Sequence, residues 1–146
     1  MNSYQFIDFL VIHEHEMDNY SPIAGSYAIV KCSGKFLICY NKWRNQWEFP
    51  AGKRELHESA KQCAMRELYE ETGQIVYDLR FIGLVKSKND LSGKLKFNPV
   101  YMTEVQTLQP FIKNDEIEKT MLWDMTEEIN PFDSLDKAFI PYLLDL

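Results

Sequence analysis

The chain contains 146 residues, of which 45% are hydrophobic, 14% aromatic and 26% charged. This length suits one domain of ordinary size, and we expect a single domain over residues 1–146. The apolar and aromatic content excludes an intrinsically disordered chain, which would lack the material for a core. The formal net charge of −6 argues against an extended nucleic-acid-binding surface, because affinity for nucleic acid comes largely from Lys and Arg that neutralise phosphates. A small anionic ligand stays compatible with this charge if a metal ion or a local basic group offsets the repulsion.

The three cysteines, Cys32, Cys39 and Cys63, form no closely spaced Cys-x-x-Cys pair. Each lies in apolar or strand-like sequence, so we expect buried small side chains rather than a disulfide or a zinc site. Such cysteines fit a reducing compartment. The first residues lack the basic segment of a secretory signal, and no apolar run approaches the roughly 18–20 residues of a membrane span. We therefore expect a cytoplasmic protein with no membrane partner.

The N-terminal part of the chain is rich in residues that favour strands. The segment Tyr4–Glu14 contains many Phe, Ile, Leu and Val residues and predicts a first strand. Asp18–Ser21 has the composition of a turn. The runs Tyr27–Val30 and Phe36–Tyr40 flank the turn Ser33-Gly34-Lys35, which predicts a β-hairpin.

The run His13-Glu14-His15-Glu16 contains two potential zinc ligands. On a strand, alternation would send His13 and His15 to the same face, but the sequence offers no third ligand nearby. We therefore interpret this run as the polar end of the first strand.

The C-terminal half combines further strands with a helix. We expect strands at Leu79–Val85, Phe97–Val105 and Thr120–Met125, with a polar loop at Lys86–Lys94. The segment Asp133–Leu144 has the apolar spacing of a helix, and Pro141 within it predicts a kink or a break. This mixture of strands and helices indicates an α+β domain with α/β/α layers.

The most regular helix is predicted at Ser59–Thr72. Ser59 and Gln62 have the spacing of a capping box, and Gly73 follows the last turn, where a left-handed residue is expected. One stripe of this helix, the side that we expect to face the protein, consists of Ala60, Ala64, Glu67 and Glu71.

Part of this helix face is acidic. Glu67, Glu70 and Glu71 fall within a wedge of roughly 100° around the helix axis, on or beside the stripe that faces the protein. Burying three unpaired carboxylates would cost several kcal/mol, so the pattern requires compensation. A divalent cation with oxygen ligands would supply it, and a structural ion-pair network is the alternative. Arg66, four residues before Glu70, could orient that carboxylate.

This helix also carries a known motif. Gly52, Glu58 and the run Arg66-Glu67-Leu68-Tyr69-Glu70-Glu71-Thr72-Gly73 resemble the Nudix box, GX5EX7REUXEEXGU, in which U is apolar. Every fixed Gly, Glu and Arg of the pattern is present. The last apolar position is a departure, because it falls on Gln74. Because Ile75 follows, a small register change could still supply the apolar contact.

The resemblance to Nudix proteins implies a divalent metal site for Mg²⁺ or Mn²⁺. The implied ligands are the carbonyl of Gly52 and the carboxylates of Glu67, Glu70 and Glu71. Of these, the resemblance gives Glu70 and Glu71 catalytic roles, with Arg66 orienting a glutamate. It assigns Glu58 and Gly73 to the structure of the motif. It also implies a Nudix-type α/β/α sandwich with a mixed sheet and a loop–helix–loop motif.

A further acidic residue is expected near a late strand, because Nudix proteins commonly place a metal ligand or a base there. The stretch Asn114-Asp115-Glu116-Ile117-Glu118 resembles that region. We select Glu116 as the catalytic candidate, with Asp115 and Glu118 as rivals. An acidic loop that is only solvated is the alternative interpretation.

Several aromatic and basic residues are candidates for contact with a substrate. Trp43, Trp47 and Phe97 could stack on a base, although packing in the core or at a sheet edge is the commoner role. Lys53 and Arg54 lie just inside the box and could meet phosphate charge, although they could also be solvated.

The resemblance implies metal-dependent hydrolysis of a diphosphate linkage in a nucleoside diphosphate derivative. A nucleoside triphosphate pyrophosphohydrolase, including one that clears oxidised nucleotides, is the leading hypothesis. Hydrolysis of ADP-ribose or dinucleoside polyphosphates, and removal of pyrophosphate from RNA 5′ ends, are alternatives. A non-catalytic nucleotide-binding regulator is an alternative from another class. The expected partner is a small nucleotide, and we expect a monomer or a homodimer.

Overall fold

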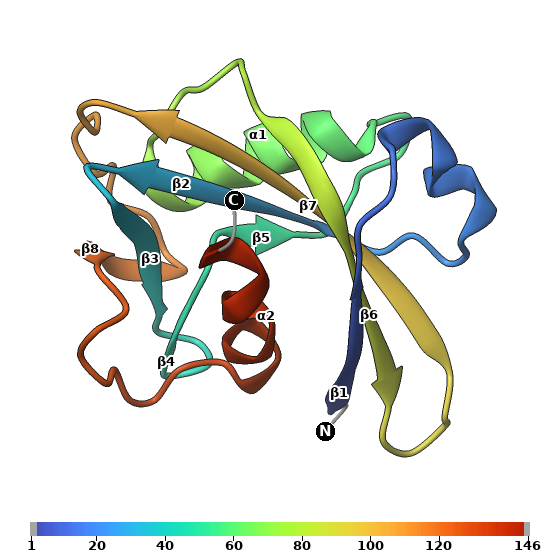
Figure 1. Cartoon of the computed structure of the whole chain (residues 1–146). Helices are drawn as coiled ribbons and strands as arrows, with labels where there is room; N and C mark the ends of the chain where they lie inside the picture. The colour runs from blue at the N-terminus through green and yellow to red at the C-terminus, as the bar shows by residue number, and fades with distance from the viewer. Residues whose placement is uncertain (1–2, 145–146) are drawn as a thin grey trace.

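The computed structural model describes residues 3–144 of the chain. One eight-stranded sheet forms its centre, with the main strand order β1-β6-β7-β2-β3-β4, while β5 pairs with β2 and β8 pairs with β3 (Figure 1). The strands are β1 (Tyr4–Leu10), β2 (Ser26–Cys32), β3 (Lys35–Asn41), β4 (Gln46–Glu48), β5 (Ala51–Gly52), β6 (Arg80–Asn89), β7 (Leu95–Val105) and β8 (Ile117–Trp123). The sheet is mixed, because β2 and β7 are parallel whereas the other pairs are antiparallel.

Helices cover both faces of the sheet. Helix α1 (Ala60–Thr72) packs on one face and helix α2 (Ser134–Leu144) on the other (Figure 1). Alternation along β2 divides the core between these faces, since Ile29 belongs to the cluster under α2 and Ala28 to the cluster under α1. The predicted α+β fold, an α/β/α sandwich with a mixed sheet, is confirmed.

The first strand is shorter than predicted. β1 ends at Leu10, and a 3₁₀-helix, η1, occupies Glu14–Asn19. His13 begins this helix, and its backbone N–H donates to the Glu16 carboxylate at 2.8 Å. The interpretation of His13–Glu16 as a polar strand end is therefore wrong. The Glu16 side chain caps a helical turn instead.

The predicted loop at Lys86–Lys94 is also wrong for its first four residues, which belong to a strand. β6 continues to Asn89 and β7 begins at Leu95, which leaves a tight connection of residues 90–94. The Asn89 side chain accepts hydrogen bonds from the backbone of Leu91 and Ser92, both at 2.9 Å. This local turn allows the polar flanking residues to stay in the ladder.

The remaining differences concern short or terminal segments. β8 spans Ile117–Trp123 rather than Thr120–Met125, and Met125 has a φ of 66°, which a strand cannot contain. The short strands β4 and β5 were not predicted. Helix α2 confirms the predicted C-terminal helix and continues past Pro141 to Leu144. The proline lies in the last turn, where little helix remains to be interrupted.

The three cysteines are free and buried, as predicted. Within residues 3–144, no helix is both long and apolar enough to cross a bilayer.

Candidate active site

The loop–helix–loop after β5 is fixed at both ends of α1. The Ser59 side chain accepts from the Gln62 N–H at 3.1 Å, and the Gln62 side chain accepts from the Ser59 N–H at 2.9 Å. At the other end Gly73 has a φ of 83°, and its N–H donates to the Tyr69 carbonyl at 2.8 Å. The expected capping box and left-handed C-terminal glycine are both present, so the start and end of the acidic helix are defined locally.

Arg66 is the hub of the polar contacts on this helix. Its guanidinium donates to both carboxylate oxygens of Glu58, at 2.6 and 3.0 Å, and to the Lys53 carbonyl at 2.8 Å. It also donates to Glu67 at 2.8 Å and to Glu70 at 3.1 Å. These hydrogen bonds hold the pKa of Glu58 below its ordinary value. Arg66 thus ties the preceding loop to two of the three helix glutamates.

Glu71 is the most deeply buried of the three helix glutamates. The residue is 3% exposed, and its carboxylate accepts from the Ala51 N–H at 2.9 Å. Burial, together with the charges of Glu116 and Glu67, raises the pKa of Glu71 to about 9. Among residues 3–144, no basic side chain pairs with Glu71. The folded chain therefore buries an acid that lacks a compensating cation.

The backbone at Gly52 adjoins the carboxylate of Glu67. A Cβ atom at Gly52 would collide with the Glu67 carboxylate, so only glycine permits this approach. The Gly52 carbonyl accepts from the Cys63 thiol at 3.2 Å. Burial raises the pKa of Glu67 despite its contact with Arg66. Carboxylate and carbonyl oxygens of this kind are the donors that Mg²⁺ and Mn²⁺ prefer, so the residues fit such an ion.

The three helix carboxylates do not converge on a common point. Over the described range 3–144, no three His, Cys, Asp or Glu side chains form a group that could hold a metal ion. Arg66 accounts for this, because its guanidinium binds Glu67 and Glu70 while Glu71 turns to the Ala51 N–H.

Glu116 lies immediately before β8. Its carboxylate accepts from the Asn41 side chain at 2.8 Å, and its charge contributes to the raised pKa of Glu71. The rivals Asp115 and Glu118 are exposed, and Glu118 lies 3.8 Å from the Lys119 ammonium. Of these three acids, Glu116 has the place nearest to the helix glutamates.

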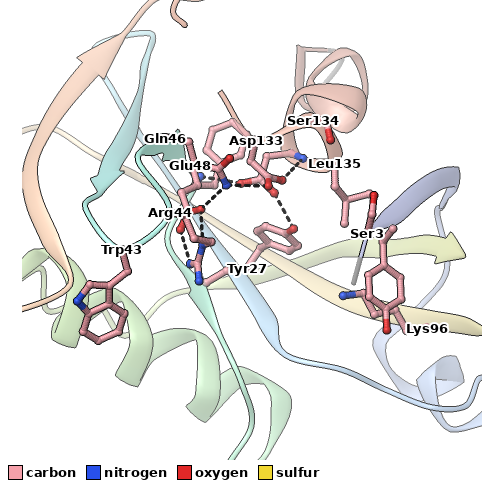
Figure 2. A pocket seen from close by; sticks show the side chains of 14 residues that line it. Ser3, Tyr27, Trp43, Arg44, Gln46, Glu48, Lys96, Asp133, Ser134 and Leu135 are labelled. Carbon is pink, nitrogen blue, oxygen red and sulfur yellow. Dashed lines mark hydrogen bonds and ion pairs between the residues drawn. The ribbon is translucent and has the colours of Figure 1, made fainter. Parts of the chain in front are cut away.

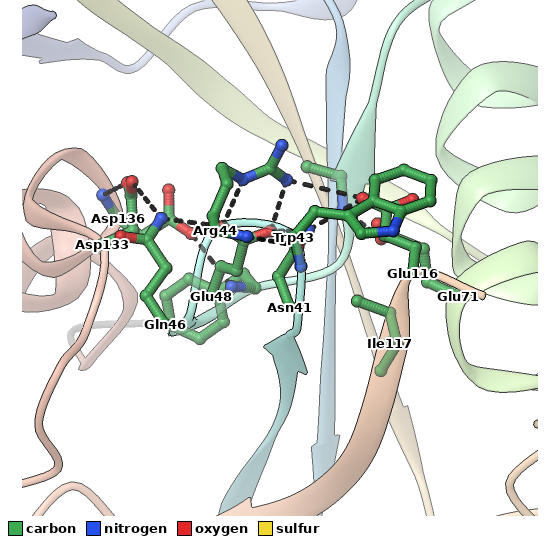
Figure 3. Close-up of polar contacts among 12 residues, drawn as sticks. Asn41, Trp43, Arg44, Gln46, Glu48, Glu71, Glu116, Ile117, Asp133 and Asp136 are labelled. Atoms are coloured by element: carbon green, nitrogen blue, oxygen red, sulfur yellow. Dashed lines mark hydrogen bonds and ion pairs between the residues drawn. The ribbon is translucent and has the colours of Figure 1, made fainter. Parts of the chain in front are cut away.

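A polar network that the sequence did not reveal connects Glu116 to a second carboxylate, Glu48. Figure 3 shows Arg44 in contact with both carboxylates. Its guanidinium lies 2.6 Å from Glu48 and 3.5 Å from Glu116. The Asn41 side chain donates to the same two carboxylates, at 3.0 and 2.8 Å. Glu48 also accepts from the Gln46 side chain at 2.9 Å. There was little sign of this network in the sequence, since Asn41, Arg44, Gln46 and Glu48 lie before the box and not within it.

This network borders a cavity of about 730 Å³ between the sheet and the start of α2 (Figure 2). Ala51 lines it, so the cavity adjoins the site of Glu71. At its floor the Tyr27 hydroxyl donates to Asp136 at 2.7 Å, and the Phe49 N–H donates to the same carboxyl at 2.9 Å. Burial, with the nearby charge of Asp133, raises the pKa of Asp136 well above its usual range. The volume is suited to a nucleotide-sized ligand.

The five candidates for contact with a substrate lie in different environments. Lys53 and Arg54 are exposed at the start of the box. Trp47 is half-buried and packs edge-on against Tyr40, with ring centroids 5.5 Å apart. Phe97 is only 7% exposed and packs on Tyr20 in the cluster under α1. Stacking of Phe97 on a base is therefore wrong, because this ring belongs to the core.

An exposed aromatic residue does border the cavity. Trp43 is 65% exposed and lines the end of the cavity near Arg44 (Figure 2). Its backbone N–H is held by the Asn41 side chain at 3.0 Å. Of the aromatic candidates in the sequence, Trp43 has the position best suited to stacking on a ligand.

The sequence model of the NUDIX domain matches residues 22–143. The chain belongs to the NUDIX family. Two curated relatives share part of this NUDIX domain. The provisionally named 8-oxo-dGTP diphosphatase YtkD of Bacillus subtilis (strain 168) is 34% identical over 85 residues, which cover 57% of this chain and 51% of the relative. The RNA pyrophosphohydrolase of Pasteurella multocida (strain Pm70) is 36% identical over 73 residues, which cover 49% of this chain and 35% of the relative.

Solved NUDIX structures share the fold over a longer range. A mutant of the Bacillus subtilis pyrophosphohydrolase BsRppH has a TM-score of 0.75 at 22% identity, covering 99% of this chain and 89% of that chain. The NUDIX domain of Shewanella oneidensis NrtR, solved with ADP ribose, has a TM-score of 0.69 at 16% identity, covering 92% and 98%. At these identities the likeness concerns the fold alone.

The departure of this chain from the NUDIX box, at Gln74, has a structural solution of its own. Gln74 is 5% exposed, and its side-chain amide donates to the Gln109 carbonyl at 2.7 Å and accepts from the Gln109 N–H at 2.8 Å. Ile75 is 47% exposed. The expectation that Ile75 replaces the apolar contact is wrong, because a paired amide fills the position.

Replacing Gln74 by Leu would restore the apolar residue of the family pattern, yet we expect it to destabilise the fold. The change leaves the N–H and carbonyl of Gln109 without their side-chain partner, which costs about 1 kcal/mol. Urea unfolding measures the difference. Gln106→Leu, at an exposed glutamine, is the matched control. A Gln74→Leu protein more stable than wild type would show that the amide pairing contributes nothing.

Proposed function

We propose that the chain hydrolyses a diphosphate linkage in a nucleotide and depends on a divalent cation. The observation that carries this proposal is the uncompensated acid Glu71, buried beside Glu67 and the carbonyl of Gly52. A buried carboxyl of this kind is a stability cost that a folded protein retains for function. Mg²⁺ or Mn²⁺, when bound there, supplies a Lewis acid that polarises a diphosphate oxygen and offsets phosphate charge.

The proposed ligands are Gly52, Glu67, Glu70 and Glu71. Arg66 keeps Glu67 and Glu70 oriented through its guanidinium, and Glu58 braces Arg66 from the preceding loop. We assign to Glu116 the proton released when water attacks phosphorus. Glu116 faces Glu71, and its side chain is 26% exposed, so it can reach a water molecule. The anhydride oxygen leaves with the departing phosphate, and no nucleophilic side chain is required.

The cavity beside Ala51 provides the proposed place for the nucleoside. Its walls combine aromatic rings, Tyr27 and Trp43, with polar groups at Arg44 and Asp136. Such a lining supports stacking and hydrogen bonding of a base. A nucleoside triphosphate, including an oxidised one, is our leading substrate, since one curated relative is named as an 8-oxo-dGTP diphosphatase. RNA 5′ ends are the second candidate, since another is named as an RNA pyrophosphohydrolase.

We further infer a cytoplasmic setting, because all three cysteines are free and buried. The partner would be a small nucleotide rather than a membrane, and the protein would act as a monomer or a homodimer.

Turnover should require added Mg²⁺ or Mn²⁺ and disappear in excess EDTA. The test is a screen of nucleoside triphosphates, oxidised nucleotides, ADP-ribose, dinucleoside polyphosphates and 5′-triphosphorylated RNA with each cation. The products of each reaction show which phosphate bond is cleaved. Nucleotide binding without hydrolysis across the whole screen would favour a regulatory role. Undiminished hydrolysis after complete metal removal would contradict the proposed site.

A further inference from the structure

The cavity beside the site has two different ends. Trp43 and Arg44 lie at one end and Lys96 lies at the other, with Tyr27 between them (Figure 2). The first end adjoins the acidic site, because the Arg44 guanidinium is 3.5 Å from Glu116. A ligand with its diphosphate at the acidic site would therefore extend toward Lys96.

The strand register gives the scale of this separation. Tyr27 pairs with both Ala51 on β5 and Val100 on β7, and Lys96 lies four residues before Val100. With about 3.3 Å per residue and about 4.8 Å between strands, the Cα atom of Lys96 lies roughly 16 Å from that of Ala51. After allowance for the side chain, this distance spans a nucleoside beyond the diphosphate. Lys96 is too remote to serve the scissile phosphates themselves.

Lys96 is the cation of this cavity that no carboxylate in the described part of the chain neutralises. Arg44 forms ion pairs with Glu48 and Glu116, at 2.6 and 3.5 Å. Lys96 is half-buried, and within residues 3–144 no carboxylate lies at ion-pair distance from it. Its ammonium instead lies 3.7 Å from the centroid of the Tyr4 ring. An aromatic face offsets part of the cost of burial but leaves the hydrogen-bond donors of the ammonium free.

The acids that face Lys96 are already engaged elsewhere. Asp133 accepts from the Gln46 side chain at 2.9 Å and from the Asp136 N–H at 3.0 Å. Asp136 is occupied by Tyr27 and Phe49, and burial raises its pKa, which favours the uncharged form. Lys53, the other charged group that acts on Lys96, is a cation and repels it. An anionic group from a ligand would neutralise the ammonium charge of Lys96.

We propose that Lys96 forms a second anion subsite, which binds a phosphate on the 3′ side of the nucleoside, remote from the diphosphate. This inference rests on the proposed function and assigns its substrate class: nucleotides that carry phosphate on both sides of the nucleoside. A phosphodiester at the 5′ end of an oligonucleotide and a 3′-phosphate monoester present the same chemistry. Tyr4, which contacts the ammonium, fixes the side chain toward this end of the cavity.

The test compares three substrates that share one base. They are the nucleoside 5′-triphosphate, the same compound with a 3′-monophosphate, and the 5′-triphosphorylated dinucleotide. Lys96→Met removes the charge at similar length, Lys96→Arg keeps it, and Lys96→Gln is a second neutral variant. Lys88→Met is the matched control, because Lys88 is exposed on the opposite face of the same hairpin.

For Lys96→Met and Lys96→Gln we expect kcat/KM to fall about tenfold or more on substrates that carry the second phosphate. On the plain triphosphate we expect less than about a twofold change, given that the subsite would be empty. Lys96→Arg should retain most activity, and Lys88→Met should match wild type. The slope of log(kcat/KM) against log salt should become shallower by about 0.7 for the dinucleotide, which is the value for one phosphate contact on a single strand.

The outcomes separate this inference from the proposed function. Loss on the dinucleotide alone identifies the diester as the ligand, and loss on the 3′-monophosphate alone identifies the monoester. An equal loss on all three substrates would overturn the inference, because it would indicate a general packing role. So would a wild-type enzyme that hydrolyses the triphosphate and gains nothing from a 3′-phosphate. A wild-type protein that cleaves none of them contradicts the proposed function itself.

Discussion

Replacing Glu71 by Gln is expected to lower turnover by about 10³-fold or more while leaving the metal-free fold as stable as wild type, or more stable. Losing one oxygen ligand removes several kcal/mol of transition-state stabilisation, at about 1.4 kcal/mol per tenfold in rate. Gln keeps nearly the same shape and can still accept from the Ala51 N–H, which Glu71 binds at 2.9 Å. The change therefore removes an ionisable group without changing the packing.

The pH dependence of stability provides a second readout for the same variant. Burial raises the pKa of Glu71 from 4.5 to about 9. Between these values the folded, metal-free protein holds a proton that the unfolded chain has released. The contribution of Glu71 to the free energy of unfolding is therefore complete below pH 4.5. It is lost as the pH rises toward about 9. Glu71→Gln should lack this decline.

The test of Glu71→Gln combines thermal melts with initial rates of hydrolysis. The melts are recorded at several pH values, with and without Mg²⁺. Mg²⁺ should raise the Tm of wild type more than that of the variant, because ligand binding to the folded state stabilises it. Glu104→Gln, at an exposed glutamate, is the matched control. Normal hydrolysis by Glu71→Gln would remove Glu71 from the site. A metal-free Tm well below wild type would instead give Glu71 a structural role in the fold.

The motif helix was predictable because its determinants are local in sequence. Ser59, Gln62 and Gly73 define its start and end within one helix, and all three have the predicted contacts. The arrangement of Glu67, Glu70 and Glu71 followed from helical spacing alone. The positions of the long strands along the chain were predictable for the same reason. Each of these strands contains enough β-forming residues to be recognised from its own sequence.

The short strands could not be predicted, because long-range pairing creates them. β5 contains only Ala51 and Gly52, and it is a strand because these residues pair with Tyr27 and Ser26. No pattern within two residues can signal that. The 3₁₀-helix at Glu14–Asn19 was missed for a related reason, since its side-chain cap competed with the extended form that alternation favoured.

The cavity was hidden from the sequence because its parts are far apart along the chain. Tyr27 and Asp136, which meet at its floor, are 109 residues apart. Gln46 and Asp133 are 87 residues apart. Charged residues in such segments normally indicate solvated surface, and only the fold brings them together. The motif could thus suggest a reaction, whereas the position of a substrate depended on tertiary structure.

Replacing Arg66 by Lys is expected to lower kcat about 10–100-fold and to weaken the apparent affinity for Mg²⁺. Losses of this size are typical when a group that orients metal ligands is changed. The Arg66 guanidinium holds Glu58 through two hydrogen bonds, at 2.6 and 3.0 Å, while also holding Glu67 at 2.8 Å. A Lys ammonium keeps the charge but lacks the planar fork, so it cannot keep these partners aligned together.

The measurement is a titration of activity with Mg²⁺ at saturating nucleotide, together with a thermal melt. Arg80→Lys, the same exchange at an exposed arginine, is the control and should match wild type. If Arg66 orients the glutamates, part of the lost rate should return at high Mg²⁺, because mass action opposes the weakened affinity. If Arg66→Lys keeps the wild-type rate and Mg²⁺ dependence, the contacts of Arg66 serve the loop alone. A large fall in Tm with unchanged Mg²⁺ dependence would lead to the same conclusion, since Arg66 would then stabilise the fold without positioning Glu67 or Glu70.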